Sequence, residues 1–169
     1  SNSPVLHGAR HAGLRFSRVA ECYSTGMVTG ESDVGGLVGL NGREVANCYS
    51  TSTVTGDSHV GGLVGVNWIA DWTDNGIASP IGGFVDQCYS TGVVTGNSHV
   101  GGLVGSNTDF RGEGGVVSQS LWDTQTSGQA TSGGGAGKTT PEVQTAQTFL
   151  DAGWDFVGET ANGTEDIWK

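Results

Sequence analysis

Several kinds of residue are scarce in this chain, and each scarcity excludes a class of protein. Only 7 residues are Lys or Arg against 17 Asp or Glu, so the formal net charge is −10. This balance argues against a nucleic-acid partner, because phosphate binding needs a basic surface. No apolar run approaches the roughly 18 residues of a membrane-spanning helix, so we expect no membrane span. With 3 prolines and no Gly-X-Y period, the 31 glycines do not indicate collagen.

Charged residues make up only 14% of the chain, a share that is ordinary for an extracellular repeat protein. We therefore expect an extracellular or cell-surface location. The first residues, Ser1-Asn2-Ser3-Pro4, lack the charged and apolar regions of a signal peptide. A length of 169 residues suits one domain, and we expect it to be part of a longer protein.

A block of twenty residues is repeated three times with few differences, at Cys22–Asn41, Cys48–Asn67 and Cys88–Asn107. Each copy begins with Cys-Tyr-Ser-Thr and ends with Val-Gly-Gly-Leu-Val-Gly before one further residue and the Asn. A period of roughly 20–50 residues is typical of solenoids and repeat arrays, in which each repeat buries its apolar face against its neighbours. Proteins of this kind usually build surfaces and seldom build active sites.

The copies differ in the length of chain that joins them. The Asn of one block is followed by a link of different length before the next block or, after Asn107, before Ser120, which holds the fourth Cys position. Insertions confined to one point of a repeat map to loops on one face, which is often the binding face.

The short runs rich in Val, Thr and Tyr predict three strands per repeat, with polar turns such as Glu31-Ser32-Asp33 between them. We expect an all-β fold, a right-handed β-solenoid of about three full coils in which equal residues of successive copies stack. The asparagines would form an amide ladder at a corner with left-handed backbone geometry. Either both faces of the Val-Gly-Gly-Leu-Val-Gly strand are covered or one apolar stripe is exposed. The expected valine ladders are Val28/Val54/Val94, Val34/Val60/Val100 and Val38/Val64/Val104.

The repeated block resembles the GLUG repeats of bacterial and archaeal surface proteins, over about residues 13–128. Such repeats occur in filamentous adhesins and beside the protease domains of some secreted immunoglobulin-cleaving metalloproteases. Similar proteins often continue into a tail like Leu121-Trp-Asp-Thr-Gln-Thr-Ser-Gly128 and on to Ala152-Gly-Trp-Asp-Phe156. The resemblance implies an extracellular β-solenoid with adhesive or scaffolding duty, and it carries over no catalytic residue.

The two ends of the array differ. We expect residues 1–21 to be a partial N-terminal coil, 22–128 the repeats, and 129–169 a flexible Gly-rich linker, a capping helix and a C-terminal segment. Thr139 and Glu142 predict a capping box for a single helix over about 141–152, with Trp154, Phe156 and Trp168 covering the last coil. The N-terminal edge has no such shield, so end-to-end self-association through it is possible.

Three cysteines share one position of the repeat, and we expect them to be reduced and buried as small hydrophobes. No Cys-x-x-Cys or Cys/His spacing accompanies them, so a metal cluster is not indicated. Asp33, His59 and His99 also share one position. On paper they form a two-histidine, one-carboxylate set, but a solvated turn is the simpler interpretation because no partner for the histidines is evident.

The strongest candidates for ligand binding lie in the two insertions. Aromatic rings beside carboxylates suit sugar or peptide recognition. The alternative is that Trp68 and Trp72 fold back as a local lid. Whether calcium binds these loops stays open. The candidate residues are Trp68, Asp71, Trp72, Asp74, Asp109, Phe110, Arg111 and Glu113.

Two functions follow from these features. We expect a noncatalytic surface, adhesion or scaffolding module with no cofactor and no metal, whose partner is a surface glycan or a protein. The alternative is a carbohydrate-binding accessory module of a larger secreted polysaccharide-degrading enzyme. A Ser132–Thr139 segment similar to a phosphate-binding loop does not follow a buried strand, so it does not indicate nucleotide binding.

Overall fold

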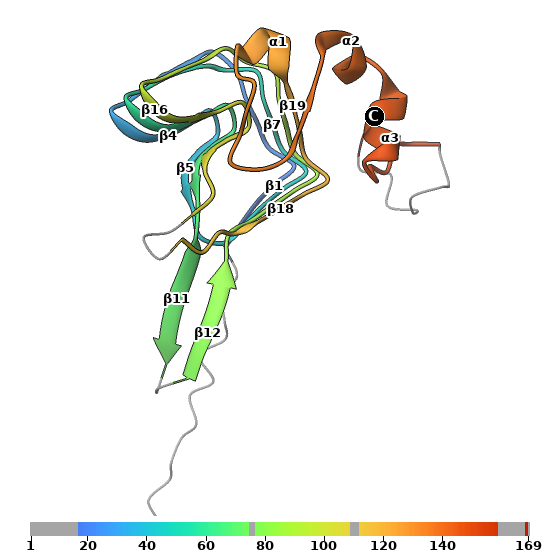
Figure 1. Ribbon diagram of the computed structural model, residues 1–169. Helices are drawn as coiled ribbons and strands as arrows, with labels where there is room; N and C mark the ends of the chain where they lie inside the picture. The colour runs from blue at the N-terminus through green and yellow to red at the C-terminus, as the bar shows by residue number, and fades with distance from the viewer. Residues whose placement is uncertain (1–16, 75–76, 109–111, 159–167, 169) are drawn as a thin grey trace, which may run out of the picture.

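The computed structural model describes residues 17–74, 77–108, 112–158 and 168. Within them the chain is mostly short β-strands with three short helices (Figure 1). The expectation of an all-β fold is confirmed. In the part of the chain described, no helix has the length and apolar character needed to cross a membrane.

Five parallel sheets organise the structure, and each takes one equivalent strand from successive repeats. The first repeat spans residues 18–41, the second 44–67, the third 84–107, and a partial fourth 116–123. The first sheet contains β1 (Arg18–Ala20), β6 (Glu44–Ala46), β13 (Phe84–Asp86) and β18 (Val116–Ser118). The second contains β2 (Tyr23–Ser24), β7 (Tyr49–Ser50), β14 (Tyr89–Ser90), β19 (Leu121–Asp123) and β20 (Ala136–Lys138).

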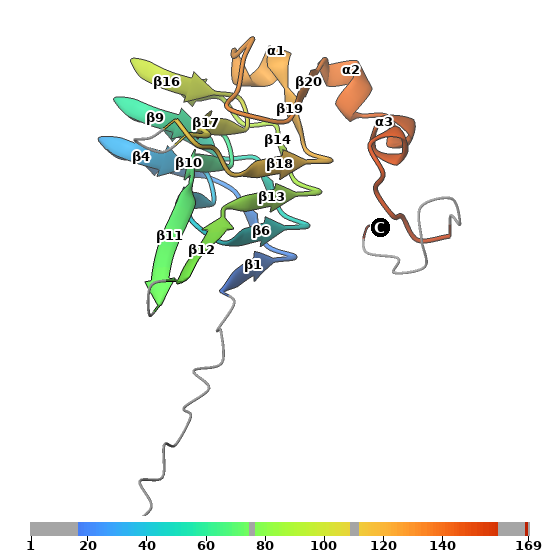
Figure 2. The ribbon, with the colours of Figure 1, turned by 60° about the horizontal axis from the view of Figure 1, so that its bottom comes forward.

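The other three parallel sheets contain one strand from each complete repeat. The third is built from β3 (Met27–Thr29), β8 (Thr53–Thr55) and β15 (Val94–Thr95). The fourth is built from β4 (Ser32–Gly35), β9 (Ser58–Gly61) and β16 (Ser98–Gly101). The fifth is built from β5 (Val38–Asn41), β10 (Val64–Asn67) and β17 (Val104–Ser106). Figure 2 shows the strands of successive repeats side by side.

The expected valine ladders are confirmed by the strand register. Val54 pairs with Val28 and Val94, Val60 with Val34 and Val100, and Val64 with Val38 and Val104. The expectation of three strands per repeat is wrong, because each complete repeat forms five. The Val-Gly-Gly-Leu-Val-Gly run bends at its glycine pair and supplies two strands.

The bend depends on close packing of the backbone. A Cβ on Gly36 would lie 2.2 Å from the carbonyl oxygen of Gly62, so only glycine fits between these corners. The polar segment before the run is also not a simple turn. Ser32 and Asp33 belong to β4, where Asp33 adopts a left-handed φ of 54°.

The bend also explains why both faces of the run are buried. Val60 belongs to one apolar cluster, with Val34, Val54 and Val94. Leu63 and Val64 lie beyond the bend in a second cluster. The other buried members of that cluster are Val45, Cys48, Val85, Cys88, Leu103, Val104 and Trp122.

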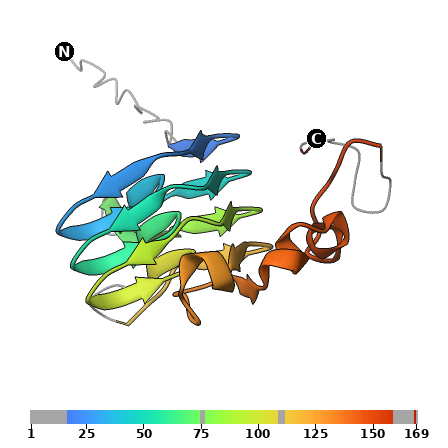
Figure 3. The same ribbon diagram turned by 90° about the horizontal axis from the view of Figure 1, so that it is seen from above.

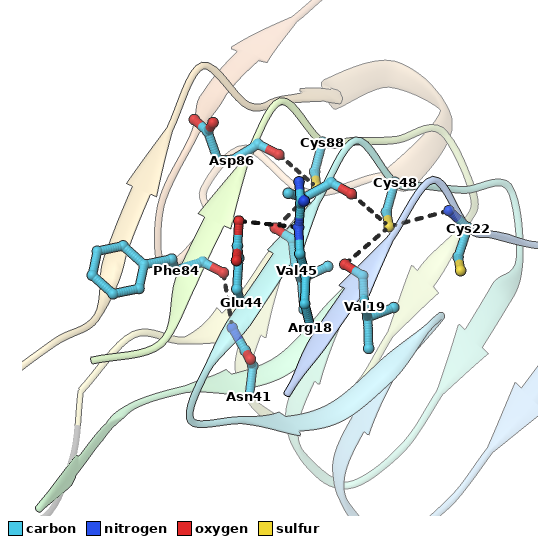
Figure 4. A network of polar contacts seen from close by, with 11 residues as sticks. Arg18, Val19, Cys22, Asn41, Glu44, Val45, Cys48, Phe84, Asp86 and Cys88 are labelled. Atoms are coloured by element: carbon cyan, nitrogen blue, oxygen red, sulfur yellow. Dashed lines mark hydrogen bonds and ion pairs between the residues drawn. The ribbon is translucent and has the colours of Figure 1, made fainter. Parts of the chain in front are cut away.

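The predicted asparagine ladder is present. The Nδ2 of Asn41 donates to Oδ1 of Asn67, and the Nδ2 of Asn67 donates to Oδ1 of Asn107, both at 2.8 Å. Asn41 also donates to the Phe84 carbonyl (Figure 4). The predicted left-handed geometry is wrong for this ladder. Left-handed residues instead occupy two other corners, at Glu21/Asn47/Gln87/Gln119 and at Asp33/His59/His99.

The first insertion forms an antiparallel hairpin of β11 (Ile69–Asp74) and β12 (Ile77–Gly82). Figure 1 shows it projecting away from the parallel sheets. Trp68, at its base, forms a β-bridge with Gly114 of the second insertion. The two insertions therefore meet at their bases.

The Gly-rich stretch is not the flexible linker that the sequence suggests. The Gly133 N–H donates to the Val104 carbonyl at 2.7 Å, and the Gly102 N–H donates to the Thr131 carbonyl at 3.1 Å. The segment then continues into β20, which pairs with β19. Residues 129–138 therefore cover the end of the third repeat, and Trp122 fills the interior there with its indole N–H bound to the Gln129 carbonyl.

The predicted single C-terminal helix is broken in two, and a further turn of helix precedes it. They are α1 (Thr124–Ser127), α2 (Thr140–Val143) and α3 (Ala146–Asp151). The backbone of Thr145 is extended (φ −111°, ψ 119°), and its hydroxyl donates to the Pro141 carbonyl, an alternative to continuing the helix. As predicted, Thr139 and Glu142 pair, since the Glu142 carboxylate accepts the Thr139 N–H at 2.7 Å.

The tail also covers a different surface from the one expected. Phe149 and Trp154 pack on Leu121 and Tyr89 of the second sheet. Figure 3 shows α2 and α3 beside the stacked strands, with α1 and β20 at the end of the stack. The tail therefore shields the side of this sheet.

Candidate functional site

An open groove of about 450 Å³ runs along the stacked repeats between the fourth and fifth sheets. It crosses all three complete repeats, so it is a property of the stack and of no single repeat. Its lining combines three ionisable groups, three apolar side chains and two hydroxyls. These residues are Asp33, Leu40, His59, Val66, Trp68, His99, Ser106 and Thr108.

The floor of the groove is one column of the fifth sheet. Val66 pairs in register with Leu40 on one side and Ser106 on the other. Leu40 is 52% exposed, whereas Val66 and Ser106 are buried. The floor therefore changes from apolar at the first repeat to hydroxylated at the third.

Glycines of the fifth sheet let its backbone pack closely against the backbone of the fourth sheet. A Cβ on Gly65 would lie 2.6 Å from the backbone carbon of Asp33, and one on Gly105 would lie 2.7 Å from that of His59. Side chains at these positions would push the fifth sheet away from the fourth. The Gly that follows Val38, Val64 and Val104 thus keeps the fifth sheet close to the fourth along the groove.

The opposite wall carries the Asp33, His59 and His99 column. The Nδ1 of His59 lies 3.0 Å from Oδ1 of Asp33, and the rings of His59 and His99 have centroids 4.8 Å apart with a 39° tilt. All three side chains are partly or largely exposed. In the described part of the chain, no group of three or more such side chains is arranged to hold a metal ion directly.

Trp68 closes the groove on the side of the hairpin. Of the two predicted patch residues whose side chains the structure describes, Trp68 and Glu113, Trp68 lines the groove, and its side chain is half-buried. Its backbone is fixed from both sides, since its N–H donates to the Asn41 carbonyl at 3.0 Å and its carbonyl accepts the Gly83 N–H at 2.7 Å. Trp68 therefore lies at the edge of the groove, and its contact with a ligand stays a prediction.

The other predicted patch residues are not brought into the groove by the described structure. Asp71, Trp72 and Asp74 lie on β11, and their side chains are outside the described part. Glu113 is exposed on the second insertion. Asp109, Phe110 and Arg111 lie outside the described residues.

Sequence reasoning missed the floor of the groove, although a signal was present. Leu40, Val66 and Ser106 are the one variable position in an otherwise repeated Val-Gly-x-Asn segment. A position that varies among copies of a stacked block is one that the core does not constrain. The same holds for the Asp33 column on the opposite wall.

The cysteine position has a structural role. The Cys88 thiol donates to the Asp86 carbonyl at 3.1 Å (Figure 4). The Cys88 N–H donates to Ser120 Oγ at 3.1 Å, so Ser120 does hold the fourth place. Burial raises the pKa of the Cys88 thiol and keeps it protonated. The expectation of three buried thiols is wrong for Cys22, which is exposed because the described structure has no strand beyond the first repeat to cover it.

A second hollow, of about 250 Å³, lies where the tail meets the second sheet. Tyr49 stacks on Tyr23 and Tyr89 at 5.2 and 5.0 Å. Tyr89 also contacts the rings of Phe149 and Trp154. Burial raises the pKa of Tyr89, with a smaller contribution from Tyr49. These contacts join the tail to the sheet, and we assign the hollow a packing role.

Comparison with curated proteins and with solved structures found no match to this chain. One family model, described as the GLUG motif, matches residues 30–55. This segment runs from the end of β3 in the first repeat to β8 in the second, so it includes the first copies of both walls of the groove. The chain is a protein that carries the GLUG motif, in agreement with the resemblance of its repeated block.

Proposed function

We propose that the chain is a noncatalytic extracellular module for adhesion or scaffolding, built as a right-handed β-solenoid of about three full coils. The observation that supports it best is the shared register of all five parallel sheets. Each complete repeat contributes one strand to each sheet, in the same chain order. A path that visits five sheets in the same order in every repeat is that of a coil, and parallel crossovers are almost always right-handed.

A module for surface contact is supported by where the variable parts gather. Both insertions leave the repeats directly after the asparagine ladder, and Trp68 and Gly114 join their bases. The groove opens beside them. A rigid stack that presents loops and a groove together suits recognition of an extended partner, either a surface glycan or a protein.

The test replaces residues 68–83 by the Gly42-Arg43 link of the first repeat. The shortened chain keeps every strand of the parallel sheets and loses the hairpin. Immobilised parent chain should bind extracellular-matrix proteins or glycans in an array, and the shortened chain should lose at least part of this binding. Turnover of a polysaccharide by the parent chain, measured as new reducing ends, would contradict a noncatalytic module.

A carbohydrate-binding accessory module is the second candidate, and Trp68 at the edge of the groove favours it. An indole face beside hydroxyls and imidazoles offers the apolar and directional contacts that sugar rings use. Trp68→Ala should then abolish glycan binding, whereas Tyr23→Ala, which removes an exposed aromatic from a different sheet, should not. Equal loss in both variants would argue against the groove as the sugar site.

Self-association through the N-terminal edge is a further part of the proposal. Strands β1 to β5 are each the outermost strand of their sheets among the described residues. An outermost strand presents N–H and C=O groups that an added strand can bind. A concentration series in analytical ultracentrifugation should show weak association. The Met27→Lys variant, which places a charge on a 76% exposed edge residue, should reduce it.

A further inference from the structure

His59 and Asp33 form a pair of a kind that is common behind metal ions. The Asp33 carboxylate lies 3.0 Å from Nδ1 of His59 and can only accept a hydrogen bond. Nδ1 must therefore carry the proton. In the neutral ring, this leaves the lone pair of Nε2 free to bind a metal.

A second imidazole stands next to the first. His59 and His99 occupy the same register position on β9 and β16, between the paired residues Ser58/Ser98 and Val60/Val100. The ring centroids are 4.8 Å apart. Both residues hold a left-handed φ, of 51° and 50°, and both line the groove, so the backbone fixes the two rings on one wall.

We propose that His59 and His99 bind one divalent transition-metal ion, with Asp33 as the residue that orients His59. Imidazole ligands suit zinc, nickel and copper, whereas calcium and magnesium prefer oxygen ligands. Only two protein ligands are needed, which agrees with the finding that no described group of three is arranged for a metal. Water or groups of a partner molecule in the groove complete the coordination.

The carboxylate is what makes this site more than two neighbouring histidines. A ligating histidine almost always donates its other N–H to a carboxylate, a carbonyl or water, which fixes the tautomer and raises its basicity. In the sequence, Asp33 shares a repeat position with the two histidines, but nothing there shows that it bonds to His59. The structure supplies it from the adjacent repeat, through the same register that stacks the valines.

The experiment is a titration with zinc chloride, followed by calorimetry. The parent for this test carries His7→Ala, His11→Ala and Cys22→Ser, because the other two histidines and the exposed thiol could also bind zinc. We expect one ion per chain, no heat with calcium chloride, and loss of binding in His99→Asn and in His59→Asn. Asparagine is chosen because it tolerates the left-handed backbone that alanine would strain.

The orienting role is tested separately. Asp33→Asn should weaken zinc binding by about 10- to 100-fold while the ion still binds. Asp57→Asn removes an exposed carboxylate two residues from His59 and should leave the affinity unchanged. Nickel should broaden the ring resonances of both His59 and His99 in the same His7→Ala, His11→Ala, Cys22→Ser parent. Absence of binding, or an affinity that His99→Asn leaves intact, would overturn the site, and equal effects of Asp33→Asn and Asp57→Asn would overturn the orienting role.

Discussion

The hydroxyl of Ser132 accepts the N–H of Leu103 at 3.2 Å. At the equivalent corner of the preceding repeat, the Leu63 N–H is bound by the Leu103 carbonyl at 2.9 Å. The same hydroxyl accepts the Val104 N–H at 2.9 Å. One serine in the Gly-rich segment thus substitutes for the corner of a further repeat. Two backbone donors at the last complete corner are therefore satisfied without a further repeat.

Ser132→Ala should therefore destabilise the chain. Two backbone N–H groups would lose their acceptor beside buried Leu103 and Val104, and an unsatisfied buried donor costs about 1–3 kcal/mol. Thr131→Ala is the matched control, because Thr131 contributes only its carbonyl to this corner. Urea unfolding followed by circular dichroism measures both. Equal stability of the two variants would show that the hydroxyl does not cap the stack.

Two truncations should distinguish the segment 129–138, which covers the end of the third repeat, from the tail 139–169, which shields the side of the second sheet. Removal of residues 139–169 should lower stability without increasing assembly beyond that of the parent chain, because Tyr89 and Leu121 lose Phe149 and Trp154. Removal of residues 129–169 should cause end-to-end assembly, because the third repeat then presents open strands. Light scattering coupled to size-exclusion chromatography reports both. End-to-end assembly of the variant that lacks only residues 139–169 would show that the tail, and not the segment 129–138, protects the end of the stack.

The three cysteines should differ in reactivity toward thiol reagents. Cys22 is exposed, whereas Cys48 and Cys88 are buried. In the native chain, iodoacetamide should therefore modify Cys22 alone, and all three should react in denaturant. Mass spectrometry of tryptic peptides identifies the modified sites. Rapid native labelling of Cys88 would mean that the interior of the stack opens readily.

Asp123 should make stability depend on acid pH. Burial acts to raise its pKa, but hydrogen bonds from the Thr126 N–H, the Thr140 hydroxyl and the Gln125 N–H outweigh it and lower the pKa below the ordinary value. Because the folded pKa is depressed, this stabilisation is present above the unfolded pKa of about 4. It is lost as pH falls through the folded value.

Two substitutions at this position test the assignment. Asp123→Ala removes the cap of α1 and should cost about 1–2 kcal/mol at neutral pH. Asp123→Asn keeps a capping oxygen, so it should cost less and should flatten the acid limb of stability against pH. An unchanged acid limb in Asp123→Asn would assign the pH dependence to other carboxylates.

The repeated block made the strand columns predictable. When the copies stack, equal positions such as Val34, Val60 and Val100 become neighbours in adjacent strands. Sequence could not show that the glycine pair bends the chain, since this depends on backbone contacts such as that of Gly36 with Gly62. It also could not show that Ser132 binds Leu103, because the segment looks like a linker until the end of the stack is placed beside it. Of the predicted loop patch, Trp68 lies at the groove, while the Leu40 column was missed because its only signal is variation.

The central claim is that the repeats stack in parallel and in register, and methyl contacts test it most directly. In a sample with labelled Val and Leu methyl groups, Val60 should show nuclear Overhauser effects to both Val34 and Val100, its partners in the neighbouring repeats. Leu63 should likewise show them to Leu37 and Leu103, whose backbones it joins by hydrogen bonds. Contacts of Val60 confined to its own repeat would contradict the stacked architecture, and with it the groove and the metal site.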